Sequence, residues 1–201
     1  MAERANAVAK KVTDEKEPGI GVSSRLTWLV LIYRVPTEPS RLRAGVWRRL
    51  RNMGAVYLQN SVAAVPRSAE RERALRALRN DIVENMDGKA FLLSSKTLAG
   101  EADLIVTINA ARDDEYEEIL DKCRDFHAGL DKEVAEEHFT YGELEENEED
   151  LNKLRRWFDK VKARDALGAG KAADVAEALE GCNAALQDFA ARVYDVDTDS
   201  Y

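Results

Sequence analysis

The chain has 201 residues, with 38 acidic against 30 basic side chains and a formal net charge of −8. This length allows one large domain or two small ones, and the acidic balance argues against a protein that coats nucleic acid with its whole surface. Two cysteines make no disulfide framework, and the longest apolar run, Trp28 to Tyr33, is far too short to span a membrane, so we expect a cytoplasmic protein without membrane partners.

The N-terminal part of the chain predicts a tail followed by a strand and a helix. Residues 1–26 are polar and lack the apolar stretch of a secretory signal, which indicates a disordered tail. From Thr27 the run TWLVLIYRV is β-branched and aromatic, as is typical of a strand. A helix follows, with Thr37 or Ser40 as its expected N-cap and Gly54 at its end.

The next segments complete a mixed fold. AVYLQNSVAAV predicts two short strands joined at Gln59 and Asn60. A second helix is expected from Ser68 to about Met86, and AFLLSSKTL predicts another strand. Strand, helix, hairpin, helix and strand follow the ferredoxin-like βαββαβ order. We therefore predict an α+β fold with a ferredoxin-like domain over residues 27–100.

Residues 101–201 are expected to form an acidic helical region packed on or beside that domain. Between positions 101 and 160 the chain has 20 acidic and 8 basic residues. The first ten residues, EADLIVTINA, are one more strand candidate. Three helical segments follow, with apolar residues at alternating three- and four-residue steps. Helices with such seams pack against each other or against a sheet.

The first predicted helix concentrates positive charge, with five arginines and no acidic residue. Arg41, Arg48 and Arg51 fall opposite its apolar stripe, and Arg43 lies on one flank. From position 41 to 79 there are ten arginines, no lysine and two acids. The planar guanidinium matches phosphate, carboxylate or another oxyanion with two parallel hydrogen bonds. Three interpretations stay open: pairing with the acidic helices, binding to a phosphate backbone, and binding to a small oxyanion.

The residues predict no catalytic centre, metal site or cofactor. Cys123 and His127 are four positions apart, a spacing that could share a soft metal. Both lie on or beside an apolar stripe, however, where cysteine packs as a small hydrophobic residue, and Cys182 occupies a similar position. His138 follows two glutamates but no second histidine completes a zinc pattern. A Gly-rich phosphate loop and a nucleophile–base pair are also lacking.

Two long stretches resemble a known family. WLVLIYRVPTEPSRLRAGVWRRLRNMGAVYLQNSVAAVP resembles the N-terminal domain of the ChrB family of chromate-resistance regulators, and FTYGELEENEEDLNKLRRWFDKVKARDALG is similar to the family's later helical region. The resemblance covers about residues 26–195. It implies a chromate-responsive, DNA-binding transcriptional regulator that acts as a homodimer. The residues expected to contact DNA phosphates or chromate are Arg41, Arg43, Arg48, Arg51, Arg73 and Arg76.

Two differences from the relatives narrow what the resemblance implies. Longer ChrB proteins carry a second, C-terminal domain linked to chromate resistance, which we expect this chain to lack. Distantly similar CRISPR-associated nucleases hold a metal with an acidic residue at the end of the first strand. Here Arg34 stands at that place, and its charge repels a divalent cation, so we expect no nuclease activity. The alternatives are a thiol-dependent chromate-reducing enzyme that uses Cys123, and a protein-interaction module without a ligand of its own.

Overall fold

The computed structural model describes residues 26–198; the tail predicted for residues 1–26 therefore lies outside this range except for Leu26. No helix within this range is both long and apolar enough to cross a lipid bilayer. The described residues form an α+β fold with four strands and five helices: β1 (Thr27–Arg34), α1 (Ser40–Asn52), β2 (Val56–Gln59), β3 (Val62–Pro66), α2 (Ala69–Asn85), β4 (Lys89–Lys96), α3 (Glu101–Ala135), α4 (Tyr141–Arg164) and α5 (Ala172–Thr198).

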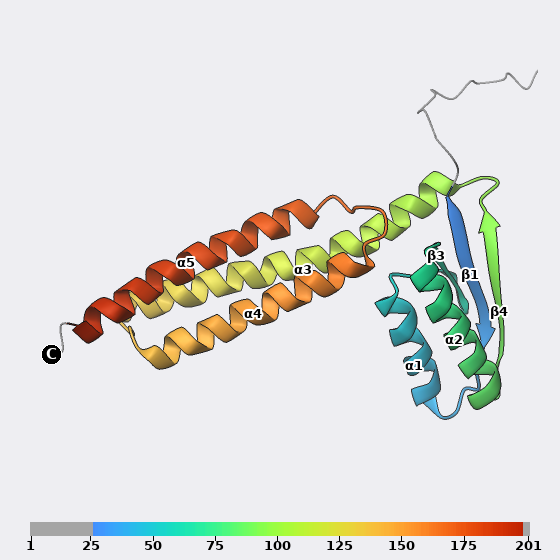
Figure 1. The fold of residues 1–201 in the computed structure, drawn as a ribbon, viewed down its shortest axis with the longest axis horizontal. Coiled ribbons are helices and arrows are strands. Elements are labelled where there is room, and N and C mark those ends of the chain that lie inside the picture. The colour runs from blue at the N-terminus through green and yellow to red at the C-terminus, as the bar shows by residue number, and fades with distance from the viewer. Residues whose placement is uncertain (1–25, 199–201) are drawn as a thin grey trace, which may run out of the picture.

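The strands form one antiparallel sheet in the order β2-β3-β1-β4, and α1 and α2 cover one of its faces (Figure 1). The predicted hairpin is present, and Asn60 and Ser61 join its two strands. Alternate residues of β1, Leu29 and Leu31, pack under the two helices because successive side chains of a strand point to opposite faces. This core therefore fixes which side of each helix faces solvent.

The strand predicted in EADLIVTINA is wrong, because these residues are the first turns of α3. The run of β-branched residues favours a strand locally. In the structure, Leu104, Ile105 and Ile108 have helical spacing and pack against Trp28 and Val56 on the face of the sheet opposite α1 and α2. Burial of this helical stripe outweighs the local strand preference.

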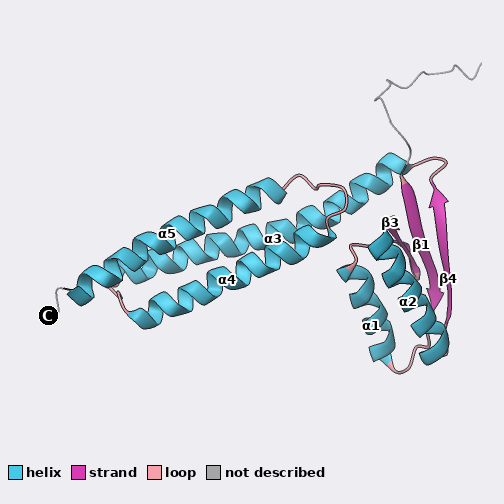
Figure 2. Cartoon of the chain, in the orientation of Figure 1, coloured by secondary structure: helices cyan, strands magenta, loops and turns pink. Residues whose placement is uncertain are grey.

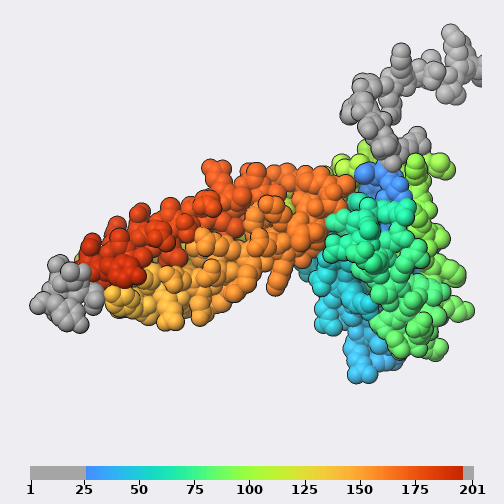
Figure 3. Space-filling view, in the orientation of Figure 1, coloured from blue at the N-terminus to red at the C-terminus, as the bar shows by residue number. Residues whose placement is uncertain are grey.

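Beyond the sheet, α3 continues into a three-helix bundle with α4 and α5 (Figure 2). The bundle extends as an arm from one side of the sheet and its two helices (Figure 3). Its core contains the apolar seams expected from the sequence, and α3 alone contributes Tyr116, Ile119, Cys123, Phe126 and Leu130. One helix thus belongs to two cores.

Candidate functional site

The local structure of α1 decides which arginines face outward. Pro39, in an extended conformation, is its N-cap and makes no side-chain hydrogen bond, so neither Thr37 nor Ser40 caps the helix as expected. The helix ends at Asn52 with Met53 as its C-cap, and the chain turns at Gly54, whose φ of 77° lies in the left-handed region. Val46 and Leu50 are buried, so the opposite side of the helix faces solvent.

Three of the arginines predicted as binding residues on α1 are exposed and have no acidic partner among the described residues. Arg41, Arg43 and Arg48 are exposed, and none of them forms an ion pair with any residue between positions 26 and 198. The acidic helices therefore do not neutralise these three guanidinium groups. We call Arg41, Arg43 and Arg48 the arginine face. An uncovered group of like charges attracts anions, and each guanidinium can donate two parallel hydrogen bonds to a phosphate.

The two predicted residues of α2 differ from each other. Arg73 is exposed and makes no ion pair within the described range, whereas Arg76 donates to Glu72 from Nε at 3.1 Å and from Nη2 at 2.7 Å. Glu72 also accepts from Arg67 at 2.9 Å. The hydrogen bonds from Arg76 and then from Arg67 lower the pKa of Glu72. Arg73 is therefore available to a ligand, and Arg76 already has a partner.

An ion pair ties α1 to α2. Arg49 on α1 donates to Asp81 on α2, with Nη1 and Oδ2 2.5 Å apart. The pKa of Asp81 is lowered, first by a hydrogen bond from Asn85 and then by Arg49. This contact joins α1 to α2, which lie side by side on the same face of the sheet (Figure 1).

Arg51 is also exposed, but it belongs to a different cluster because its guanidinium has an acidic partner. Its Nε lies 3.6 Å from Oε1 of Glu115 on α3, and its guanidinium stacks over Trp47 at 5.5 Å from the ring centroid. Arg164 on α4 donates to Oε2 of the same carboxylate from Nε at 2.8 Å and also from Nη2. Internal pairing, one of the three interpretations of the arginine helix, therefore describes Arg51 but not the arginine face.

Arg112 completes this cluster, which we call the Glu115 cluster. Its Nη1 lies 3.1 Å from Oε1 of Glu115, but not in hydrogen-bonding geometry, and both side chains are buried. Burial lowers the pKa of Arg112, and the charge of Glu115 opposes that shift. Sequence reasoning missed both residues. The sequence does contain a signal for them. Arg112 and Glu115 have opposite charges and lie in line with the apolar stripe of α3, which continues at Tyr116 and Ile119.

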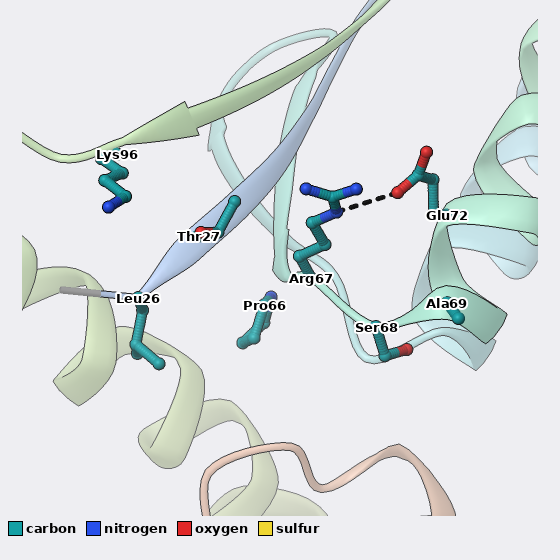
Figure 4. Close-up of a pocket in the computed structure, with 8 residues that line it drawn as sticks. All are labelled: Leu26, Thr27, Pro66, Arg67, Ser68, Ala69, Glu72 and Lys96. Carbon is teal, nitrogen blue, oxygen red and sulfur yellow. Dashed lines mark hydrogen bonds and ion pairs between the residues drawn. The ribbon is translucent and has the colours of Figure 1, made fainter. Parts of the chain in front are cut away.

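A hollow of about 570 Å³ on the described surface lies at the start of β1 (Figure 4). Arg67 in its wall is paired with Glu72, and Ser68 caps α2 by accepting from the backbone N–H of Arg71. Arg67, Glu72 and Ser68 therefore serve the structure at the start of α2. The whole lining consists of Leu26, Thr27, Pro66, Arg67, Ser68, Ala69, Glu72 and Lys96.

Residues 43–200 match a protein-family model described as Protein ChrB, N-terminal. The chain belongs to the ChrB family. Membership connects this chain with chromate resistance. The match begins inside α1 and includes β2 to β4, α2 and the helices of the bundle, whereas β1 lies before it. No curated protein and no solved structure matches the chain significantly.

Arg34, the departure from the nuclease pattern, is the last residue of β1 in this ChrB-family chain. Arg34 is exposed and lies opposite Lys89 on β4. The position at which the nucleases have a metal-binding acid is therefore occupied by one cation and faces a second.

Among the described residues, the one group of side chains close enough to share a metal is Glu133, Glu136 and His138, at the end of α3. These are mostly exposed, and His138 Nδ1 lies 3.1 Å from Glu133 Oε2.

The two cysteines are core residues of the bundle, as the sequence indicated. Cys123 on α3 and Cys182 on α5 are both buried, and the Cys182 thiol donates to the carbonyl oxygen of Cys123 over 3.7 Å. Burial raises the pKa of both thiols, that of Cys182 to about 12. A buried thiol that stays protonated is a poor nucleophile and a poor metal ligand.

Proposed function

We propose that this ChrB-family chain is a chromate-responsive transcriptional regulator that binds duplex DNA, acting as a homodimer in the cytoplasm. The observation that carries the proposal is the arginine face: three guanidinium groups on one helix, exposed and without acidic partners in the described part of the chain. Arg73 on the neighbouring helix α2 is likewise exposed and makes no ion pair within the described range, while the whole protein has a net charge of −8. Such local asymmetry directs an anionic partner to one side of the molecule.

Phosphate contacts of this kind supply affinity and orientation. Guanidinium groups on the outer side of α1 and α2 suit the sugar–phosphate backbone, which carries no direct sequence information. Selection of an operator then depends on contacts to base edges or on DNA shape. The arginine face is therefore proposed as the positioning part of a DNA interface.

Chromate fits the same proposal because it is a tetrahedral oxyanion like phosphate. An oxyanion that occupies guanidinium groups of the arginine face competes with DNA phosphates for the same donors. Chromate would then release the regulator from DNA. Measuring DNA binding with increasing chromate, and with sulfate as the control anion, tests this step. If the two anions weaken DNA binding equally, the effect is one of ionic strength and not of chromate recognition.

The DNA interface is tested by changing Arg48 to Ala and measuring binding to promoter DNA by fluorescence anisotropy at several salt concentrations. We expect weaker binding to all DNA sequences by a similar factor. The slope of log affinity against log salt should fall by roughly one unit, because one phosphate contact fewer releases one counterion fewer. Arg41→Ala should behave in the same way.

Arg124→Ala is the matched control, since Arg124 is an exposed arginine of α3 that pairs with Asp121 and Glu117. It should leave both affinity and salt slope unchanged. The proposal fails if Arg48→Ala and Arg124→Ala have the same small effect, or if the unchanged protein binds no DNA at low salt.

We also infer that β1 to β4 with α1 and α2 make a ferredoxin-like domain. The βαββαβ element order and the fully antiparallel pairing of the sheet support this assignment. In each strand–helix–strand unit the two strands are separated by a third strand of the sheet. This arrangement places both crossover helices on one side, where α1 and α2 present their arginines together.

The chromate-reducing alternative is less well supported. Reduction of chromate by a thiol requires an accessible sulfur with thiolate character. Cys123 and Cys182 have neither property, because both are buried and burial raises their pKa values. We therefore do not propose an enzymatic role for them.

A further inference from the structure

The sheet face opposite α1 and α2 is only half covered. The first turns of α3 pack over its Trp28 end through Ile108. At the other end, three apolar side chains on β1 and β4 stay exposed by 39%, 63% and 47%: Ile32, Phe91 and Leu93. Ile32 and Phe91 are direct register partners, so the exposed side chains are contiguous. We call these three residues the sheet patch; contiguous exposed apolar surface marks an interaction site.

A second apolar surface lies on α3 itself. Leu104, Ile105 and Ile108 face the sheet, and the opposite side of the same turns faces solvent. At four-residue spacing this outer side carries three exposed residues, which we call the α3 stripe: Ala102, Val106 and Ala110. Val106, in the second turn of α3, is 66% exposed, although valine is one of the residue types most often buried.

The charges that border these two surfaces have opposite signs. Arg34 and Lys89, register partners at the open end of the sheet patch, are both exposed. Asp103 and Asp114 are exposed beside the α3 stripe, and residues 101–111 include no basic side chain. Contact between two sheet patches would place cations on cations. Contact between a sheet patch and the α3 stripe of another molecule would place cations near acids.

We propose that two copies of this chain associate by placing the sheet patch of each on the α3 stripe of the other. The surface is self-complementary in the sense required by a two-fold axis, since each copy offers both halves of the contact. In each copy, its own α3 covers one half of the sheet face. The α3 of the partner would lie next to it and cover the other half. Two sheets then enclose two antiparallel helices.

This interface leaves the arginine face free. Arg41, Arg43 and Arg48 lie on the outer layer of α1, on the other side of the sheet from Phe91. The inference rests on the proposed homodimer and names its interface. It is tested without DNA, so its failure would not be confused with a failure of DNA binding.

The test is sedimentation equilibrium of the full chain at micromolar concentrations. The unchanged protein should be a dimer. Phe91→Glu and Val106→Glu should each raise the dissociation constant of the dimer by roughly 30-fold or more, as for central apolar residues of an interface. Val83→Glu is the matched control, because Val83 is 38% exposed on α2, outside the interface, and should leave the dimer intact. Circular dichroism confirms that all variants fold.

A charge exchange tests the orientation. Arg34→Glu should weaken the dimer, and adding Asp103→Lys in the same chain should restore it, because each copy then presents the reversed pair. A monomeric unchanged protein overturns the proposal, as does a dimer that survives both Phe91→Glu and Val106→Glu. A monomer that binds single-stranded DNA through Phe91 would overturn it in favour of a nucleic-acid platform on the sheet.

Discussion

At the scale of single residues, Glu115 has the most consequential position in the described chain. Its carboxylate is buried and meets Arg51 from α1, Arg112 from α3 and Arg164 from α4. One negative charge therefore compensates positive charges from three helices. Removing this carboxylate would leave Arg112 as a buried cation without its nearest opposite charge. The folded state would then be destabilised, because the desolvation of the Arg112 guanidinium is no longer offset by an ionic attraction.

Glu115→Ala should accordingly lower the free energy of unfolding by about 3–5 kcal/mol, measured by urea denaturation. The control is Glu117→Ala on the same helix, whose carboxylate pairs with Lys171 and Arg124 at a partly exposed site. Exposed pairs contribute little, so this change should cost less than about 1 kcal/mol. Equal losses in the two variants would show that Glu115 is not effectively buried.

The sequence could not assign Arg51 to this cluster. Helical spacing placed Arg41, Arg48 and Arg51 opposite the apolar stripe and Arg43 on its flank, and all four are exposed. Its partner Glu115 is 64 positions further along the chain, and only the tertiary fold brings the two together. Periodicity shows which side of a helix faces its own core; it does not show which side chains find an ionic partner on another helix.

At the scale of elements, α1 contains one glycine with room for a side chain and is followed by a second glycine without such room. Gly45 lies in the middle of the helix, and a methyl group added there would have nothing within 4 Å, whereas Gly54 turns the chain at the end of the helix with a φ of 77°. A side chain at Gly54 would also collide with the backbone carbonyl of Arg164 on α4. The end of α1 thus depends on the absence of a side chain, both for its conformation and for its approach to the bundle.

Substitution of each glycine by alanine should therefore change stability in opposite directions. Gly45→Ala should raise the free energy of unfolding by roughly 0.5–1 kcal/mol, because alanine loses less conformational entropy in a helix. Gly54→Ala should lower it by more than about 1 kcal/mol through left-handed strain and the collision with Arg164. Thermal unfolding followed by circular dichroism measures both, and a stabilised Gly54→Ala protein would contradict the description of this turn.

The elements up to β4 were largely predictable because each has a local signal. Runs of β-branched and aromatic residues identified the first strand, and α2 begins directly after its N-cap Ser68, where the helix was expected to start. The start of α3 was not predictable in the same way. Its β-branched run has the local properties of a strand, and only the packing of Ile108 against Trp28 makes it helical. The missing cap of α1 has a similar origin, since Pro39 rather than a polar side chain begins that helix.

At the scale of the whole molecule, α3 joins the two cores. Ile108 belongs to the core on the sheet, while Tyr116, two turns further, belongs to the bundle core. The Glu115 cluster lies between them and links α1, α3 and α4. Because the same helix must stay folded for both cores to exist, we expect the sheet and the bundle to unfold together.

This cooperativity can be measured with the native tryptophans. In a Trp47→Phe, Trp157→Phe variant the remaining indole, that of Trp28, is buried against α3 and donates to Glu101 at 3.2 Å. Its fluorescence reports the sheet, and circular dichroism at 222 nm mainly reports the long helices. The two urea midpoints should coincide, as for a two-state transition. Separate midpoints would show that α3 can fray at one core while the other persists.

The length of α3 has a mechanical consequence. With 35 residues it is about 50 Å long, and the part from Ile108 to its end at Ala135 spans about 40 Å. A tilt of about 10° at the Ile108 contact would move the far end of the bundle by about 7 Å, by the geometry of a rigid rod of this length. The helix acts as a lever arm, so sub-ångström repacking beneath Ile108 becomes a displacement of several ångströms at the opposite end of the protein.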